Sequence, residues 1–231
     1  MRDRRFLVLF DIDGTLLSAG RAARESVLAA LSDVYGWTHA NGNSHDFSGK
    51  TDPQIVRELV EKDVGKPRCE ELLQRALDRY LEEFSRRLTS EAVVAKPGAV
   101  ELVSRLSETP SVTLGLLTGN LERGARMKLE PLALNPRFPF GAFGSDSEDR
   151  YRLPAIAVER ARAHCGRDFA GKEVVVVGDS VHDVLCGRSL GVRSVAVATG
   201  PTTAERLAEQ GPDVLLPNFA DTSAALEAIL R

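Results

Sequence analysis

The sequence has few cysteines, no long apolar run and almost no net charge, and each shortage excludes a class of protein. Its three cysteines, Cys69, Cys165 and Cys186, are odd in number, widely spaced and without a CxxC pair. A disulfide framework favours an even number of cysteines and a zinc site favours close pairs, so we expect reduced thiols in a cytoplasmic protein. The four histidines likewise form no metal-ligand spacing.

The apolar run near the N-terminus, Phe6–Phe10, stops at Asp11. A run of this length is too short for the core of a signal peptide or for a membrane span, so we expect neither a targeting segment nor a membrane partner. The net charge is −3 with both signs interspersed, which argues against nucleic acid as a partner. A small anionic substrate would therefore need a local cluster of positive groups or a metal ion.

The 231 residues are 43% hydrophobic, which is ample for a folded core. Continuous apolar runs typical of strands buried on both faces occur at Phe6–Phe10, Val112–Leu117, Val174–Val177 and Val195–Ala198. Amphipathic stretches predict helices at Ala99–Ser107, Leu153–His164, Asp183–Leu190 and Thr202–Gln210. This alternation predicts an α/β fold with a doubly wound parallel sheet.

One interval interrupts the alternation of strands and helices. Between Leu17 and Ala95 there is no strand of comparable quality. Helical patterns appear instead at about Arg21–Tyr35, Pro53–Asp63 and Pro67–Leu88. We therefore expect a small all-helical cap domain of residues 18–95, inserted after the first strand into a core made of residues 1–17 and 96–231.

The first chemical motif follows the first strand and reads Phe10-Asp11-Ile12-Asp13-Gly14-Thr15-Leu16. Ligands of open α/β sheets bind at the carboxyl ends of the strands, which is where this motif falls. Asp11 and Asp13 could supply a nucleophile and an acid/base partner on one turn, with Gly14 relieving the backbone. They could also hold a divalent cation through hard oxygen ligands. The alternative is that Asp13 caps a helix and that Asp11 is incidental.

The second motif, Thr118-Gly119-Asn120, follows the strand at Val112–Leu117. A hydroxyl and free backbone N–H groups at the start of a helix provide a place for a phosphoryl oxygen. Thr and Asn at strand ends are also common as helix caps.

The third motif, Gly178-Asp179-Ser180-Val181-His182-Asp183, follows the Val-rich strand at Val174–Val177. Asp179 and Asp183 are one helical turn apart and point to the same side. Buried carboxylates in such a pair repel each other, which favours a cation beside them. A helix cap followed by an acid in the first turn would give the same pattern.

Together the three motifs resemble those of the haloacid dehalogenase-like superfamily of hydrolases in their order, their spacing and their place at strand ends. The resemblance covers essentially the whole chain. It extends in particular to the phosphoglycolate-phosphatase-like branch, in which a helical cap follows the first strand. The resemblance implies a phosphatase that uses Mg²⁺ to hydrolyse a phosphomonoester of a small molecule through an aspartyl-phosphate.

The resemblance also implies a role for each motif residue. Asp11 is expected to be the nucleophile and a Mg²⁺ ligand, and Asp13 the general acid/base, with its backbone carbonyl on the metal. Asp179 is expected to bind the metal directly and Asp183 to hold its waters. Thr118 is expected to bind the transferring phosphoryl group. Dehalogenases of the same fold do not need the second Asp of the first motif, so its presence favours phosphate chemistry.

One departure concerns the positive group that the superfamily usually places before the third motif. The lysine expected there is missing from Ser147-Glu148-Asp149-Arg150-Tyr151-Arg152-Leu153-Pro154. Arg150 replaces it best by its spacing to Pro154, and Arg152 is the second choice; either could hold a phosphoryl oxygen in a fork. An arginine pair in solvent is the alternative. Lys128 is a third candidate, although we expect its helix to be exposed.

The cap contains Ser48-Gly49-Lys50-Thr51-Asp52-Pro53, which reads as a loop followed by a helix that Thr51 or Asp52 caps. In the phosphatases that the chain resembles, this loop reaches the substrate, so Lys50 is a candidate for its non-phosphate end. A lysine in solvent would fit the same pattern. The substrate contacts that we expect are Gly14, Lys50, Thr118, Gly119, Asn120 and Arg150.

Other functions remain open from the sequence. A sugar-phosphate mutase has the same motifs, and a phosphonate hydrolase of this fold would use a cap lysine, here Lys50, for a Schiff base. A non-catalytic binding protein is a third possibility, although all four acidic positions are intact. Phosphate-storing receiver domains have no insertion of this size. The sequence leaves the identity of the phosphorylated substrate open, and the protein could be a monomer or a homodimer.

Overall fold

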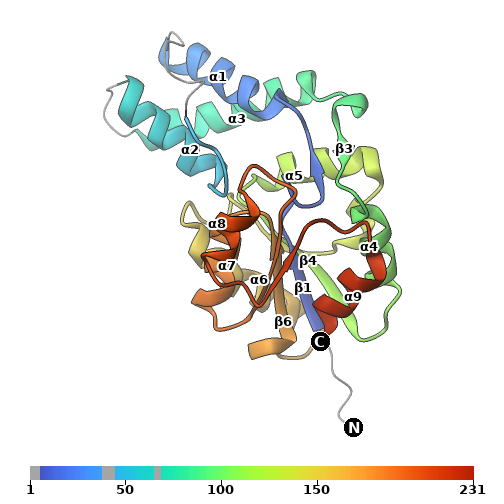
Figure 1. Ribbon diagram of the computed structural model, residues 1–231. Coiled ribbons are helices and arrows are strands. Elements are labelled where there is room, and N and C mark those ends of the chain that lie inside the picture. Colours follow the sequence, from blue (N-terminus) through green and yellow to red (C-terminus); the bar gives the residue numbers. More distant parts are fainter. Residues whose placement is uncertain (1–5, 38–44, 65–68) are drawn as a thin grey trace.

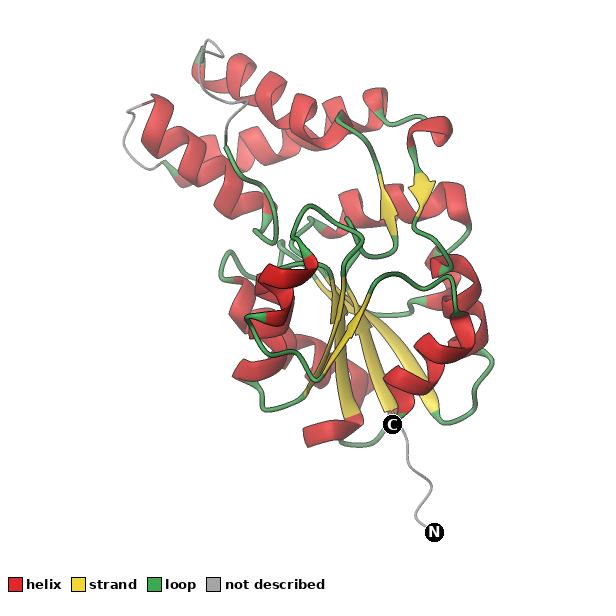
Figure 2. Cartoon of the chain, in the orientation of Figure 1, coloured by secondary structure: helices red, strands yellow, loops and turns green. Residues whose placement is uncertain are grey.

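The computed structural model describes residues 6–37, 45–64 and 69–231, which form two layers (Figure 1). The larger part, called the sheet layer below, consists of the main sheet together with the helices packed against both of its faces. The smaller part, called the helical layer below, lies above the edge at which the strands of the sheet end (Figure 2). Its elements are α1 (Ala22–Tyr35), α2 (Asp52–Leu59), a π-helical turn (Val60–Val64) and α3 (Glu70–Arg87).

Within the described residues, six strands form the main sheet in the order β5-β4-β1-β6-β7-β8, and every neighbouring pair is parallel. The strands are β1 (Phe6–Phe10), β4 (Val112–Leu117), β5 (Gly141–Ala142), β6 (Val174–Gly178), β7 (Arg193–Val197) and β8 (Val214–Leu216). The predicted doubly wound parallel sheet is therefore confirmed, and its four central strands lie where the apolar runs indicated.

Three neighbouring strands in the middle of the sheet end at the same level. Phe10, the last residue of β1, pairs with Leu116 of β4 and with Val177 of β6. The segments that follow these three strands therefore meet at one edge of the sheet. These segments carry the three motifs that the sequence singled out.

Helices cover both faces of the sheet. They are α4 (Ala99–Ser107), α5 (Glu122–Leu129), α6 (Leu153–Cys165), α7 (Val181–Ser189), α8 (Ala204–Ala208) and α9 (Thr222–Leu230). Val8 and Phe10 of β1 belong to a core that includes α4, α5 and α9, whereas Leu7 and Leu9 belong to a core with α6 and α7. Successive side chains of a strand point to opposite faces. Because both faces are buried, the strands read as continuous apolar runs rather than as alternating ones.

Several elements were not anticipated from the sequence. The edge strands β5 and β8 have only two and three residues, which is too short to show a pattern. The burial of helix α5 was not anticipated either, because the helix contains Gly124 and is rich in charged residues. Its burial against the sheet and the helical layer depends on tertiary contacts.

The helical layer has an apolar cluster of its own, to which Trp37, Tyr80 and Phe84 contribute large buried side chains. Trp37 and Phe84 are therefore core residues of the helical layer, whereas Phe47 is only partly buried at the edge of this cluster. The three expected helices are present as α1, α2 and α3. The first residues of the expected Pro67–Leu88 helix, 67–68, lie outside the described residues.

Two short strands connect the layers. The chain enters the helical layer through β2 (Leu17–Ser18) and leaves it through β3 (Val94–Ala95), and these strands pair in antiparallel fashion. They lie at the positions expected for the boundaries of the cap. The division into a core of residues 1–17 and 96–231 and a cap domain of residues 18–95 stays a prediction. In the described part of the chain, no helix is both long and apolar enough to cross a membrane.

Candidate active site

A cavity of about 480 Å³ lies between the two layers, above the carboxyl ends of the central strands. The sheet layer lines it with Asp11, Asp13, Gly14, Thr118, Gly119, Asn120, Lys128, Arg150 and Asp179, among others. The helical layer lines it with Arg24, Phe47 and Lys50, among others. The cavity therefore collects residues of all three motifs.

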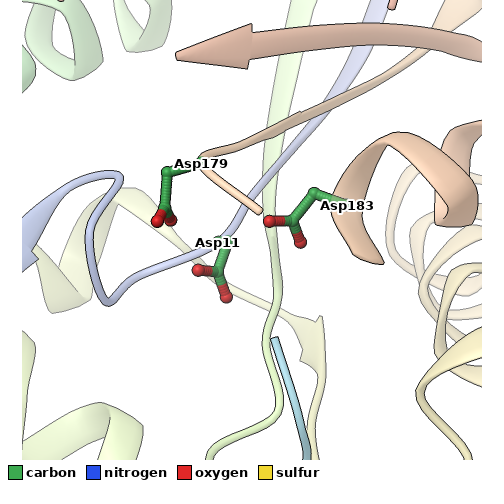
Figure 3. A group of neighbouring side chains, drawn as sticks. All are labelled: Asp11, Asp179 and Asp183. Atoms are coloured by element: carbon green, nitrogen blue, oxygen red, sulfur yellow. The ribbon is translucent and has the colours of Figure 1, made fainter. Parts of the chain in front are cut away.

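Three carboxylates, those of Asp11, Asp179 and Asp183, lie close together at the ends of the central strands (Figure 3). Asp11, Asp179 and Asp183 each offer an oxygen, and these oxygens lie within 4.8 Å of one another. The three residues are 7%, 3% and 2% exposed. Carboxylates are rarely buried together unless something positive compensates them.

Part of the compensation comes from Arg150, which is 4% exposed. Its Nη2 donates to Oδ1 of Asp183 at 2.5 Å and to Oδ1 of Asp11 at 3.2 Å. Burial opposes the charge of the guanidinium, but Asp183 and Asp11 hold the pKa of Arg150 well above its usual range. One guanidinium therefore contacts two of the three carboxylates.

The negative charge that Arg150 does not compensate raises the pKa values of two of the carboxyl groups. Burial, followed by the charge of Asp183, raises the pKa of Asp11 to about 7. Burial, followed by the charge of Asp11, raises the pKa of Asp179 to about 8. Both shifts express the cost of ionising these groups together without a further positive charge. Three clustered carboxylate oxygens are a ligand set suited to a hard divalent cation.

Asp179 is held in place by the first motif. The Thr15 hydroxyl donates to Oδ1 of Asp179 at 2.8 Å. Gly14 has a φ of +86°, and a Cβ there would lie 2.4 Å from Oδ2 of Asp179. The turn therefore requires glycine for its backbone conformation and for the close approach of the carboxylate. The N–H of Gly14 donates to the carbonyl of Leu17 at 2.8 Å and is already used within the turn.

Asp183 combines the two interpretations that its motif left open. It is the third residue of α7 and forms a capping box with Ser180. Its Oδ2 accepts from the backbone N–H and the hydroxyl of Ser180 at 3.0 and 2.6 Å, while its Oδ1 accepts from Arg150. Capping thus fixes the carboxylate that anchors Arg150.

Asp13 lies apart from the acidic cluster. Its Oδ2 accepts hydrogen bonds from Nδ2 of Asn120 at 2.7 Å and from Nζ of Lys128 at 2.6 Å. Nδ2 of Asn120 also donates to the Thr118 hydroxyl at 2.8 Å. The Asp13 side chain is 44% exposed. No helix begins at Asp13, so the alternative that it is a helix cap is wrong.

The structure separates the three candidate cations. Arg150 is buried at the acidic cluster, whereas Arg152 is exposed to solvent. The expectation that Lys128 lies in an exposed helix is wrong, because its side chain is only 2% exposed. Gly124 and Ala125 lie on the same buried face of α5, and their small size allows close packing.

Lys50 reaches the cavity from the loop before α2. Its Nζ is 2.5 Å from Oε2 of Glu58, and its side chain is 20% exposed. Thr51 is the N-cap of α2, as predicted, and accepts from the N–H of Gln54. The loop rests on the second motif, because a Cβ at Gly119 would lie 2.1 Å from the carbonyl oxygen of Lys50.

Asp52, the other predicted cap of α2, caps a different helix. Its Oδ2 accepts from the N–H of Leu121, the N-cap residue of α5, at 2.8 Å. Its own N–H donates to the carbonyl of Gly119 at 2.8 Å. These bonds fasten the helical layer to the segment that carries Thr118 and Asn120.

Sequence reasoning missed several residues of the site. Thr15 belongs to the first motif and could have been included because of its hydroxyl. Gly200 contacts Asp179 so closely that a Cβ would lie 1.6 Å from Oδ2. It was missed because it follows β7 with no acidic or basic residue beside it. Arg24 and Phe47 of the helical layer line the cavity, with the Arg24 guanidinium 4.0 Å from the centre of the Phe47 ring.

A doubly wound parallel sheet with buried carboxylates at its carboxyl edge defines the class: an α/β protein whose reactive groups lie where the strands end. Comparison with known families identifies it further. Residues 8–197 match the family of haloacid dehalogenase-like hydrolases. The chain therefore belongs to this family and is an enzyme of the hydrolase class.

Individual relatives agree with this membership. The chain is 27% identical to a phosphoglycolate phosphatase from Caulobacter vibrioides, over 96% of this chain and 91% of the relative. It is 25% identical to the pyrophosphatase PpaX from Anoxybacillus flavithermus, over 97% and 98% of the two chains. The crystal structure of a hydrolase from Pseudomonas syringae matches its fold with a TM-score of 0.75 at 21% identity, covering 98% and 100% of the chains.

Proposed function

We propose that this protein is a Mg²⁺-dependent phosphatase that hydrolyses a phosphomonoester of a small molecule through an aspartyl-phosphate on Asp11. The observation that carries the proposal is the different setting of two carboxylates from one strand end. Asp11 lies in the buried acidic cluster beside Arg150, whereas Asp13 is partly exposed and is held by neutral and positive donors. A nucleophile and an acid/base partner require such a separation of roles.

The residues that would hold the metal are Asp11, Asp179 and Asp183, together with the backbone carbonyl of Asp13. Their hard oxygens and the raised acid pKa values of the first two support this assignment. When bound, Mg²⁺ would offset the repulsion between the attacking carboxylate and an anionic phosphoryl group.

The first chemical step transfers the phosphoryl group to the enzyme. A carboxylate oxygen of Asp11 forms a bond to phosphorus as the bond from phosphorus to the ester oxygen breaks, and Asp13 donates a proton to the leaving alkoxide. Thr118 and Arg150 bind the phosphoryl oxygens. Nε of Arg150 is buried and has no hydrogen-bond partner among the described residues, so this guanidinium retains a donor.

The second step returns the enzyme to its starting state. Asp13 takes a proton from a water molecule, and that water attacks the phosphorus of the aspartyl-phosphate. The bond from phosphorus to Asp11 breaks, inorganic phosphate leaves, and the Asp11 carboxylate is restored. The helical layer above the cavity would limit the access of bulk water during the transfer.

The substrate that we propose is a small organic phosphate with a negatively charged or strongly polar remainder. The cavity of about 480 Å³ suits a small molecule, and Arg24 and Lys50 line it from the helical layer. Phosphoglycolate, the substrate named for several relatives, fits this description. Pyrophosphate, named for another relative, is the main competitor.

Lys50 bears on the phosphonate alternative. Its Nζ is engaged by the Glu58 carboxylate at 2.5 Å, whereas imine formation needs a free neutral amine. This contact favours ester hydrolysis.

The proposal is tested by incubating the protein with Mg²⁺ and a panel of phosphomonoesters that includes phosphoglycolate, pyrophosphate and an aryl phosphate. We expect release of free phosphate, and none from Asp11→Asn. A phosphorylated isomer without free phosphate would instead identify a mutase. The absence of any turnover across the panel would contradict the proposal.

A further inference from the structure

Lys128 is a buried cation that the proposed mechanism does not use. It lies in the last turn of α5 with 2% of its side chain exposed. Its Nζ donates to Oδ2 of Asp13 and to Oδ1 of Asn120, both at 2.6 Å. Burying an ammonium group is costly unless it is paired and hydrogen-bonded, so this placement requires compensation.

The compensation comes from both layers. Besides the two acceptors of the sheet layer, the ring of Phe84 from α3 lies 5.6 Å from Nζ, within reach of a cation–π contact. Asp52, at the start of α2, accepts from the backbone N–H of Leu121 at the start of the same helix α5. The helical layer therefore covers Lys128 and also fixes the helix that carries it.

The contacts constrain one oxygen of Asp13. Oδ2 receives two hydrogen bonds, one from Lys128 and one from Asn120. Oδ1 accepts no hydrogen bond from the part of the chain that the structure describes. The Asp13 side chain is 44% exposed and lines the cavity, so Oδ1 is accessible from it. Two donors on Oδ2 fix the plane of the carboxyl group and leave Oδ1 available to a bound molecule.

Lys128 also differs from Arg150 in what it contacts. The guanidinium of Arg150 is bonded to Asp11 and Asp183, which belong to the acidic cluster. The hydrogen bonds of Nζ of Lys128 go to Asp13 and Asn120, outside this cluster. The two cations therefore serve different carboxylates.

We propose that Lys128 is a positioning residue that, together with Asn120, orients the Asp13 carboxyl group for proton transfer to the leaving oxygen and from water. This inference rests on the proposed phosphatase function. It adds a residue that acts through Asp13 and that is supplied by the helix on which the helical layer rests.

The leaving group of the substrate provides a direct test. An alkyl phosphate needs a proton on its departing oxygen, whereas 2,4-dinitrophenyl phosphate has a leaving group stable enough to depart without one. Lys128→Met preserves the apolar stem and removes the donor. We expect kcat/KM for the alkyl phosphate to fall about 100-fold, within the range that general acid–base catalysis contributes, and kcat/KM for the dinitrophenyl ester to change by less than about threefold.

Two controls accompany this comparison. Arg123→Met removes one positive charge from the exposed side of the same helix and should leave both substrates unaffected. In an Asp13→Asn background, Lys128→Met should cause no further loss, because residues that act as a unit are not additive. An equal loss with both substrates would indicate a phosphoryl-binding or purely structural role, and no loss with either would also overturn the proposal.

A structural measurement decides the matter independently of activity. Crystal structures of the wild type and Lys128→Met should show the Asp13 carboxyl group rotated or in several conformers in the variant. An unchanged Asp13 would overturn the inference even if the protein hydrolyses phosphate esters. Failure of the wild type to hydrolyse any ester would count against the proposed function alone.

If Lys128→Met does not fold, Lys128→Gln, which is neutral and keeps a donor, should show the same leaving-group pattern with a smaller loss.

Discussion

Nη2 of Arg150 donates a hydrogen bond of 2.5 Å to Oδ1 of Asp183, and both side chains are almost completely buried. Asp183 is itself held by the capping box at the start of α7, so the arginine is anchored to a rigid helix end. The same nitrogen reaches Asp11 at 3.2 Å. The guanidinium is thus oriented before any substrate arrives, which is the arrangement that electrostatic stabilisation of a transition state requires.

Asp11→Asn should abolish turnover while the fold remains intact. Asn has nearly the same shape but lacks the negative charge and the nucleophilic oxygen. We expect a loss of more than about 1,000-fold in kcat, or roughly 4 kcal/mol of barrier. Thermal unfolding checks the fold, and Asp168→Asn at an exposed site serves as a matched control. Activity within about tenfold of the wild type would exclude Asp11 as the nucleophile.

Arg150 and Arg152 should differ sharply when each is replaced by alanine. Loss of a buried, charged contact to the phosphoryl group should lower kcat/KM on the order of 100- to 1,000-fold for Arg150→Ala. Arg152 is exposed, so Arg152→Ala should remain within about threefold of the wild type, as is usual for a surface substitution. Steady-state kinetics on both variants check this, with circular dichroism to confirm folding. Near-normal rates in both variants would mean that the phosphoryl-binding cation lies elsewhere.

The metal-free protein should lose stability as the pH rises from about 5 to about 8. The pKa values of Asp11 and Asp179 are raised from 3.8 to about 7 and about 8, so the fold prefers their protonated forms. The corresponding stability is complete below the unfolded pKa and is lost as the pH passes through the folded values.

Added Mg²⁺ should therefore raise the melting temperature more at about pH 8 than at about pH 5, because binding needs ionised ligands. Differential scanning fluorimetry with EDTA or Mg²⁺ measures both effects. Asp179→Asn should reduce the pH slope and the Mg²⁺ effect together. A Mg²⁺ shift of the same size at both pH values would contradict this account.

Lys50→Arg separates ester hydrolysis from cleavage of a carbon–phosphorus bond. Arginine can share the attraction of an anionic leaving group but cannot form an imine, because its guanidinium stays protonated. We expect the variant to retain measurable activity with a raised KM, and borohydride with substrate to leave no adduct on the wild type. A reduced imine trapped at Lys50, with complete loss of activity in the variant, would favour the phosphonate reaction.

The sequence alone was sufficient to predict the central strands of the sheet and to single out the acidic residues that follow them. Strands such as Phe6–Phe10 can be recognised locally, because an apolar run of this length is too short for a typical helix and is followed by Asp and Gly, which favour a turn. Parallel pairing then places the residues after each strand at one edge, which is why Asp11 and Asp179 could be brought together without coordinates.

Only the tertiary structure decided how the cations are distributed. Arg150 and Arg152 are two residues apart in a 3₁₀ turn and so point in different directions, one into the acidic cluster and one to solvent. Lys128 is buried because α3 and the first motif meet around α5, and no local pattern reports a contact between segments so far apart in the chain. Hydrophobic periodicity shows which face of an element is apolar, but the partner of a polar side chain depends on which distant segment packs against it.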